Sequence, residues 1–556
     1  MAINPISYTE KIVRSFLKYQ LSAYPFADQR LHDQMRDLLS IDKVRRTPLM
    51  RGPYISLSRG FREGASIDQL VAEGVFHPHM RQIIPGAIEH VYGHQEQALR
   101  AVHDGQTTLV STGTGSGKSE CFMYPIISRC LELEAEGANP GIVAVIVYPM
   151  NALAEDQLDR LRGLLAGSGV TFGMYVGKTP EEEKDVSGHR MQAGSSRADY
   201  EAVLSDYRDA GRPDAVHPVE EVCSRAKMRS PGKQPRILLT NVKQLELLLT
   251  RQRDVELFEG ARLDFLVFDE AHTFTGTSGA ETACLIRRLR QFCGKDADHT
   301  TCVATSATIV DEQDPDAARN FASRFFGVPA EAVVTVREEY EEDTWSPSFS
   351  PPAPSTDPRE LLLNALAAID SADPESAVRE VYVLLTGKAL PSGEWKEALF
   401  DELRTSKLAA AIRVSLMCPR ELYLLLGELQ TSVGREVSEE ELLAYLTLGA
   451  AALKDGRPLL RPVVHGFIRG ISGGVVTFPS GNEPKLWLSS EQELAHHPDA
   501  DKAWRPKILS CTTCGQHYFA SHLKDFHFTK SRPEGGQLAE GGAAFWEALD
   551  VVNGGN

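Results

Sequence analysis

Residues 111–120 read STGTGSGKSE, and they separate a short apolar run, 107–110, from an apolar segment, 121–130. A glycine-rich loop between a strand and a helix turns its backbone N–H groups toward one point, where the helix dipole adds positive potential. Such a loop binds polyphosphate, with Lys118 reaching the β- and γ-phosphates and the Ser119 hydroxyl acting as a ligand of Mg²⁺. The other residues expected around the nucleotide are Thr112, Gly113, Thr114, Gly115, Ser116 and Gly117.

The loop departs from the pattern G-x-x-x-x-G-K-[ST] at one position, because Thr112 stands where the pattern begins with glycine. Taken alone, the segment has a plain glycine-rich loop as its alternative interpretation. A second chemically capable segment, Asp269-Glu270-Ala271-His272, favours the nucleotide site. Asp269 would hold Mg²⁺ through water, Glu270 would orient and polarise the attacking water, and His272 would relay the nucleotide state. A turn that happens to carry two acids is the alternative for this segment.

The elements that must position these residues are apolar runs. The run GIVAVIVYPM, 141–150, is typical of a buried parallel strand, and further strands are expected at 171–176, 236–239, 263–268 and 301–304. Because helical segments alternate with them, we predict an α/β fold with a doubly wound parallel sheet. The acids at 269–270 then lie at the carboxyl end of a strand, where open sheets bind ligands. The next strand ends in Thr305-Ser306-Ala307-Thr308, whose hydroxyls would hydrogen-bond the histidine and acid.

The composition is that of an ordinary globular protein, with 42% apolar and 24% charged residues among 556. This length predicts roughly two to four domains. No apolar run reaches the roughly 20 residues that span a bilayer, and the N-terminus has no apolar signal region, so no membrane partner is expected. Nine cysteines, mostly in apolar segments, predict reduced thiols and a cytoplasmic location. The net charge of −17 excludes a wholly basic nucleic-acid coat but not a local basic groove.

Composition shifts divide the chain. We expect an N-terminal helical region at 1–75, an α/β domain at 76–337, a Pro/Ser-rich linker at 338–358, a helical insertion at 359–460 and a β-rich region at 461–556. The last region contains Cys511-Thr512-Thr513-Cys514, which offers two thiolates to one tetrahedral metal, usually Zn²⁺. Only half of such a site is visible, and a turn without metal is an equal alternative.

The motifs STGTGSGKS, DEAH and TSAT, in this order and spacing, resemble motifs I, II and III of the superfamily 2 DEAD/DEAH-box helicases. The segment Tyr92-Gly93-His94-Gln95 is similar to their Q-motif, in which Gln95 and the aromatic Tyr92 would contact adenine. The segment 148–153 resembles motif Ia, and 240–249 resembles the next strand-contacting motif. More loosely, the segments 16–31, 51–57, 465–474 and 511–515 resemble large bacterial helicases of antiphage defence, of the Druantia and DISARM type.

The resemblance implies a RecA-like fold for 76–337, ATP and Mg²⁺ as cofactors, and nucleic acid bound across two RecA-like domains. By position, Pro149, Asn151, Thr240 and Asn241 would contact a single strand. A basic run would add positive charge beside it, with a solvated surface as the equal alternative; its members are Arg225, Lys227, Arg229, Lys233 and Arg236. No segment has the form QxxGRxxR, which the second RecA-like domain should supply. We therefore expect the N-terminal part of a longer helicase, or one completed by another chain.

The resemblance thus implies an ATP-dependent DNA helicase or translocase in bacterial antiphage defence, which would act on single-stranded DNA or a DNA junction. Its expected partners are the missing second motor domain or a partner defence subunit. An RNA helicase is the alternative in the same class. A nucleotide-binding scaffold subunit that does not unwind on its own is the alternative in another class, although Lys118, Asp269 and Glu270 argue for an active ATPase.

Overall fold

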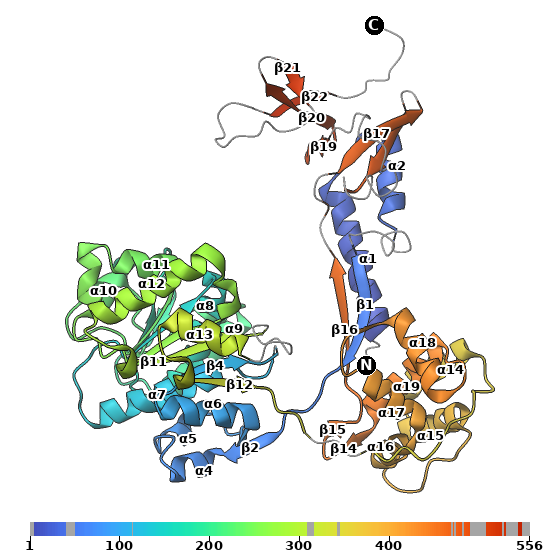
Figure 1. Cartoon of the computed structure of the whole chain (residues 1–556), viewed down its shortest axis with the longest axis horizontal. Coiled ribbons are helices and arrows are strands. Elements are labelled where there is room, and N and C mark those ends of the chain that lie inside the picture. Colours follow the sequence, from blue (N-terminus) through green and yellow to red (C-terminus); the bar gives the residue numbers. More distant parts are fainter. Residues whose placement is uncertain are drawn as a thin grey trace. The chain divides into compact units, whose positions relative to one another are not determined.

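The computed structural model describes residues 5–40, 50–113, 115–307, 316–341, 345–468, 471, 474–480, 483–489, 507–524, 527–529 and 543–547. The chain forms two compact units (Figure 1). One consists of Gly60–Glu342, and the other combines Met1–Arg59 with Asp343–Asn556. We call them the motif unit and the composite unit.

The motif unit is built on a seven-stranded parallel sheet in the order β12-β4-β11-β10-β5-β9-β6. The predicted doubly wound parallel sheet is therefore confirmed. The strands of this sheet are β4 Thr107–Ser111, β5 Ala144–Tyr148, β6 Phe172–Met174, β9 Ile237–Asn241, β10 Phe265–Phe268, β11 Thr301–Ser306 and β12 Val333–Arg337. Strand β10 begins two residues later than expected, since Leu263 has φ +44°, which no strand residue adopts.

Both faces of this sheet are buried, which explains its uninterrupted apolar strands. Along β5, Ile146 belongs to one hydrophobic core, and its neighbours Val145 and Val147 belong to the other. Helices α6, α7 and α8 contribute to the first core, and α11, α12 and α13 cover the second. The helices of the unit are α4 Ile67–Ala72, α5 Met80–Ile83, α6 Gly93–His103, α7 Glu120–Ala135, α8 Asn151–Leu165, α9 Arg197–Asp209, α10 Arg225–Arg229, α11 Val242–Leu248, α12 Gly276–Phe292 and α13 Ala317–Phe326.

Short strands complete the motif unit: β2 Glu63–Ser66 pairs with β3 His90–Tyr92, and β7 His189–Arg190 pairs with β8 Val216–His217. The first pair corrects the expected boundary after residue 75. Residues 60–75 belong to the motif unit because β2 is paired to the strand that leads into α6. Helix α4 begins after Ser66, whose hydroxyl accepts a hydrogen bond from the Gln69 N–H.

The composite unit joins the two ends of the chain, because β1 pairs with β16 and β13. The N-terminal segment is thus not a separate helical region. Ile55 of β1 lies in the same core as the predicted helical segment. Helices α1 and α2 share a second core with β17 and β18. The N-terminal elements and helices of the unit are α1 Pro5–Ala23, α2 Gln29–Leu38, β1 Met50–Leu57, α14 Pro358–Ile369, α15 Pro374–Thr386, α16 Trp395–Thr405, α17 Lys407–Ser415, α18 Leu422–Val433 and α19 Glu439–Ala451.

Strands dominate the chain after α19, as expected. They are β14 Leu453–Lys454, β15 Arg457–Pro458, β16 Pro462–Ile468, β17 Val475–Ser480, β18 Glu483–Trp487, β19 Lys507–Ser510, β20 His517–Lys524, β21 His527–Thr529 and β22 Ala543–Glu547. The short strand β13 Arg420–Glu421 lies earlier, before α18. The segment expected to be a linker is instead anchored at two places. Tyr340 bridges to Phe61, and Phe349 bridges to Ser406. In the described part of the chain, no helix is both long enough and apolar enough to cross a membrane.

Candidate nucleotide site

The strand order brings the three chemically capable segments together. The glycine-rich loop follows β4, the DEAH segment follows β10, and β11 lies between these two strands. Because all three strands are parallel, their carboxyl ends meet at one edge of the sheet. The Thr112 N–H donates to the carbonyl of Ser306 at 3.1 Å, which joins the loop to the end of β11.

The loop is held by its own side chains. Lys118 Nζ donates to the carbonyl oxygens of Thr112 (3.0 Å) and Gly113 (3.3 Å). The hydroxyls of Thr112 and Ser116 are hydrogen-bonded to each other at 2.6 Å, and Ser116 also donates to the Gly113 carbonyl at 2.8 Å. Thr112 stands where the pattern has glycine, and its hydroxyl adds a hydrogen bond within the loop. Thr114 lies outside the described residues.

Gly117 must be glycine for two reasons. Its φ is +76°, in the left-handed region. A Cβ there would also lie 2.2 Å from Gln95 Nε2. Ser119 is the N-cap residue of α7, so its hydroxyl lies at the positive end of that helix. This is where a magnesium ligand of a nucleotide site is required.

Thr305 connects the two acids of the DEAH segment. Its hydroxyl donates to Asp269 Oδ1 and accepts from the Glu270 N–H at 3.1 Å. Glu270 has φ +51°, so the chain turns sharply between the two acids. The His272 ring nitrogen Nδ1 lies 3.3 Å from Glu270 Oε2 and 3.4 Å from Ser306 Oγ. The hydrogen bonds expected between the TSAT hydroxyls and the DEAH segment are present. Ala307 is described, but Thr308 lies outside the described residues.

The electrostatics of Asp269 fit a metal-holding role. Burial raises the pKa of Asp269 above its usual range, and the hydrogen bond from Thr305 opposes this effect. The nearby Glu270 charge also raises this pKa, whereas Lys118 lowers it. A buried carboxylate of this kind is stabilised by a cation. Lys118, Ser119 and Asp269 together are thus a suitable set of groups for a magnesium nucleotide.

Tyr92-Gly93-His94-Gln95 contacts the glycine-rich loop directly. Gln95 Oε1 accepts from the Tyr92 N–H at 2.8 Å, and its Nε2 donates to the Gly117 carbonyl at 3.0 Å. His94 Nε2 donates to the Ser116 carbonyl at 2.8 Å, and burial lowers the pKa of His94, so its ring is neutral. We did not expect a role for His94 or for Phe61, whose ring centroid lies 5.0 Å from that of His94. Phe61 is distant from His94 in the sequence and bridges to Tyr340, so no local pattern indicates this ring contact.

The residues expected to contact a single strand divide into two groups. Asn241 Nδ2 donates to Asn151 Oδ1 at 2.7 Å, so the ends of β9 and β5 are joined at the surface. Pro149 precedes this pair and is partly exposed. Thr240 is fully buried, and its hydroxyl donates to the Tyr175 carbonyl at 2.8 Å. The Thr240 side chain is therefore directed into the protein, and the expected contact of this residue with a single strand stays a prediction for its backbone.

Four of the five residues of the basic run are ion-paired within the protein. Arg229 pairs with the fully buried Asp254 at 2.9 Å and with Glu181. Arg236 is 2% exposed and pairs with Glu134 at 2.9 Å. Arg225, Lys227 and Arg229 each pair with an acid of the segment 181–183, and Lys233 alone of the five is exposed. These charges fold the excursion 180–235 onto the sheet, which corrects the prediction that it adds positive charge beside nucleic acid.

Two groups of side chains contain potential metal ligands. Cys511 and Cys514 occupy a tight turn closed by the Gly515 N–H and the Cys511 carbonyl at 2.8 Å, and backbone N–H groups lower the pKa of Cys511. Within the described residues they gain no third ligand. A buried group, His217, Glu221 and Cys223, has suitable spacing. However, Arg162 already neutralises Glu221 through contacts of 2.6 and 2.7 Å.

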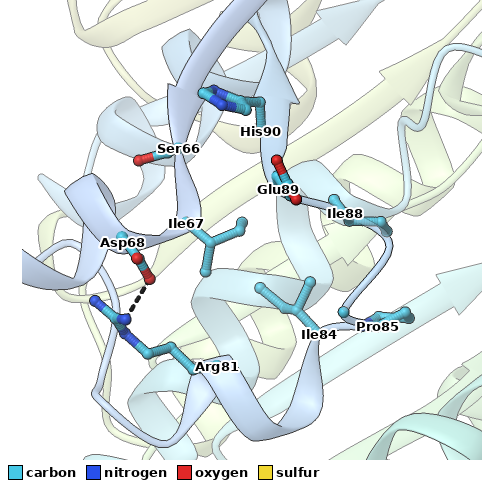
Figure 2. Close-up of a pocket in the computed structure, with 10 residues that line it drawn as sticks. Ser66, Ile67, Asp68, Arg81, Ile84, Pro85, Ile88, Glu89 and His90 are labelled. Atoms are coloured by element: carbon cyan, nitrogen blue, oxygen red, sulfur yellow. Dashed lines mark ion pairs between the residues drawn. The ribbon is translucent and has the colours of Figure 1, made fainter.

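A separate pocket of about 420 Å³ lies next to α4 and α5. Figure 2 shows Ile67 and Ile84 on its floor and the ion pair between Asp68 and Arg81 at its side. His90 and Glu89 come from the opposite side of the pocket, at the strand that leads into α6. None of the motif residues lines this pocket, so it is distinct from the nucleotide site.

Comparisons with known proteins agree with this geometry. The family model of the DEAD/DEAH box helicases matches residues 92–199 and 200–315. Druantia protein DruE of Escherichia coli (strain UMEA 4076-1) is 26% identical over 552 residues, covering 82% of this chain and 29% of DruE. The uncharacterized ATP-dependent helicase YprA of Bacillus subtilis is 26% identical over 229 residues, covering 41% of this chain and 24% of YprA. The chain thus spans less than a third of the length of these relatives.

Similar solved structures are also helicases. A crystal structure of the DUF1998 helicase MrfA bound to DNA and AMPPNP shares 19% identity, with coverage of 73% of this chain and 44% of MrfA and a TM-score of 0.33. The Mycobacterium smegmatis helicase Lhr bound to ssDNA and AMP-PNP shares 19% identity, with coverage of 61% and 42% and a TM-score of 0.33. Such TM-scores add nothing to the assignment.

The fold and the assembled motifs define a RecA-like α/β domain with a candidate nucleotide site. Residues 92–315, which carry these motifs, match the DEAD/DEAH box helicase model.

Proposed function

We propose that this chain contains the ATP-binding half of an ATP-dependent DNA helicase or translocase. The observation that carries the proposal is the position of Thr305, which hydrogen-bonds Asp269 and the Glu270 N–H next to the glycine-rich loop. Motifs I, II and III thereby form one site at the edge of the sheet. A non-hydrolysing scaffold would not need Glu270 held in a left-handed conformation beside a metal-binding carboxylate.

The residues divide the work of phosphoryl transfer. Bound ATP–Mg²⁺ supplies the phosphoryl group and the charge that neutralises its oxygens. The Lys118 ammonium, which donates to two loop carbonyls, can exchange these partners for phosphate oxygens. Ser119 and Asp269 would hold Mg²⁺, and Glu270 would orient the attacking water. His272 and Ser306 connect Glu270 to the end of β11, so they are placed to relay the state of the site.

The proposed polymer is single-stranded DNA, contacted near Pro149, Asn151 and Asn241. These side chains lie at the carboxyl edge of the sheet, where the strands before α8 and α11 end. Contacts to a phosphate backbone do not read sequence, so weak sequence preference is expected. The match to DruE supports a role in bacterial antiphage defence. The match to an RNA helicase named rok1, 28% identical over 165 residues, keeps RNA as the second candidate polymer.

The test has two arms. In the first, a fluorescent ATP analogue with Mg²⁺ is titrated against the wild type and Lys118→Ala, and the variant should bind at least about tenfold more weakly. Equal affinities would end the nucleotide assignment. In the second, matched single-stranded DNA and RNA are titrated at several salt concentrations. DNA affinity should fall steeply with salt, because phosphate contacts release counterions. Preferential binding of RNA would replace DNA by RNA as the polymer.

We also propose that Cys511 and Cys514 bind Zn²⁺ with ligands from elsewhere in the chain. The support is the tight CxxCG turn, which places two thiols at the spacing of a zinc knuckle. Metal analysis of the purified protein should find about one zinc per chain. The Cys511→Ser variant should lose it, and a wild type without zinc would show a plain turn.

A further inference from the structure

Glu120 and Arg160 form an ion pair between α7, the helix that follows the glycine-rich loop, and α8. Glu120 is the first residue of α7 and follows Ser119 directly. Its Oε1 accepts from the Arg160 guanidinium. The Glu120 side chain is 15% exposed and the Arg160 side chain is 35% exposed, so water screens the pair only partly. Two elements that are distant in sequence are therefore joined at the edge of the nucleotide site.

The second carboxylate oxygen of Glu120 faces the glycine-rich loop. Oε2 is buried and has no hydrogen-bond partner among the described residues. A Cβ placed on Gly117 would lie 3.1 Å from this oxygen, and 2.2 Å from Gln95 Nε2. Gly117 is thus enclosed between Gln95 and Glu120. Because a buried carboxylate oxygen without a partner is unfavourable, Glu120 is sensitive to any movement of the loop N–H groups near it.

The other end of α8 carries the proposed single-strand contact. Asn151 is the first residue of the helix, and it accepts the hydrogen bond from Asn241. Arg160 lies about 14 Å from Asn151 along the helix axis, at about 1.5 Å per residue. Arg162, on the same helix, is fixed by Glu221, so α8 is held firmly near Arg160. Since Arg162 fixes this end of α8, a change at Arg160 would tilt the helix about that fixed end and move Asn151 at the other end.

We propose that Glu120 and Arg160 are positioning residues that couple the nucleotide site to the single-strand contact of α8. Neither residue touches the reacting phosphates. Glu120 responds to the conformation of the loop at Gly117, and Arg160 transmits that response to α8. This inference depends on the proposed function, since it needs both ligands.

The experiment measures a coupling factor in the intact chain. The dissociation constant of labelled single-stranded DNA is determined without nucleotide and with a saturating non-hydrolysable ATP analogue. The dissociation constant of the analogue is determined with and without DNA, and the two ratios must agree by linkage. For the wild type we expect a ratio of at least about fivefold. Glu120→Gln and Arg160→Gln should each bring it to within about twofold of unity, with either ligand alone bound within about threefold of the wild type.

Two controls separate coupling from general damage. The double variant should lose no more coupling than either single variant, because both remove the same ion pair. Glu132→Gln, on the same helix α7 and paired with Arg129, should keep the wild-type ratio. A merely structural ion pair would change the melting temperature or both affinities and leave the ratio unchanged.

The outcomes distinguish this inference from the proposed function. If the variants retain the wild-type ratio, or if the wild type binds both ligands without mutual effect, the inference is overturned and the proposed function stands. If the wild type binds neither ligand, both are overturned.

Discussion

Asp269 is a buried acid whose carboxylate is held in place by one hydroxyl group. Its carboxylate is buried near Glu270, and the Thr305 hydroxyl is its hydrogen-bond donor. Without a cation the ionised form is unfavourable, because burial raises its pKa. The ionised carboxylate therefore destabilises the free protein, and binding of Mg²⁺ with nucleotide would remove this destabilisation.

We predict that Asp269→Asn stabilises the nucleotide-free motif unit at pH 7. The folded-state pKa of Asp269 is above its usual value of 3.8, so the ionised wild type loses stability as pH rises through that folded-state pKa. The stabilising difference should vanish at pH values low enough to protonate the wild type. Thermal unfolding across pH would show this, with about 2–4 °C for each 1 kcal/mol in a unit of this size. Glu132→Gln serves as the control, and a lower melting temperature for Asp269→Asn at pH 7 would contradict the prediction.

Neighbouring residues of motif-like segments can have opposite roles. Thr240 is buried against Tyr175, whereas Asn241 is partly exposed and accepts from the Gln244 N–H at the start of α11. Since side chains alternate along β9, only one of the two can face a nucleic acid.

We predict that Thr240→Val and Asn241→Ala separate stability from binding. Thr240→Val removes one buried hydrogen bond and should cost about 1 kcal/mol of stability, with DNA affinity nearly unchanged. Asn241→Ala removes a helix cap, at a similar cost of about 1 kcal/mol, and should also weaken DNA binding several-fold. Chemical denaturation and DNA titration of both variants decide this. Strong loss of DNA binding in Thr240→Val alone would contradict this separation of the two roles.

Helix α8 is anchored at its carboxyl end by a buried charge cluster. Arg162 and Glu221 are 6% exposed each, and His217 completes the cluster. Burial raises the pKa of Glu221, but hydrogen bonds from His217 and Arg162 outweigh this effect and place that pKa below its usual value. The cluster therefore stabilises the fold above the usual pKa of 4.5, and this stability is lost as pH falls through the lowered pKa.

We predict that Arg162→Met destabilises the motif unit by about 3–5 kcal/mol, because Glu221 is left buried and unpaired. Removing both charges in Arg162→Met/Glu221→Leu should be much milder, since no isolated charge remains. Urea denaturation followed by far-ultraviolet circular dichroism measures both. A double variant as unstable as the single one would contradict the ion-pair explanation.

The two units contain different spectroscopic residues. All five tryptophans lie in the composite unit, at Trp345, Trp395, Trp487, Trp504 and Trp546. The nucleotide site lies wholly in the motif unit, which has its own two cores. Ligand binding should therefore stabilise a unit that tryptophan fluorescence does not report directly.

We predict that urea denaturation gives two transitions in circular dichroism but one in tryptophan fluorescence. A magnesium nucleotide at about 100 times its dissociation constant should raise the free energy of unfolding of the motif unit by about 2.7 kcal/mol. This is the transition that circular dichroism shows and fluorescence does not. It should leave the fluorescence transition nearly unchanged, and Lys118→Ala should abolish the shift. A single coincident transition in both signals would show that the units unfold as one.

We predict that the 556-residue chain binds ATP but hydrolyses it slowly, with little stimulation by DNA. Its sequence contains no QxxGRxxR motif, and an arginine finger contributes about 10³–10⁵ in rate. Phosphate release is measured with and without single-stranded DNA, alone and with a second motor domain supplied. Glu270→Gln in the completed protein should abolish turnover while sparing ATP binding. Rapid DNA-stimulated turnover by the 556-residue chain alone would show that this chain already supplies the positive charge of an arginine finger.

The sequence by itself determined the parallel sheet and the nucleotide motifs, because both are encoded locally. Apolar strands such as 141–150 and the spacing of Lys118 and Ser119 are readable without distant contacts. Tertiary structure decided which charges are free. Arg229 and Arg236 belong to a run that is basic in the sequence, yet each forms an ion pair with an acid from another element. Arg229 pairs with Asp254, and Arg236 pairs with Glu134. It also decided which ends of the chain share a unit, since β1 pairs with β16 across hundreds of residues. Ion pairs and strand pairing depend on partners brought together only by the folded chain, and local pattern carries no information about those partners.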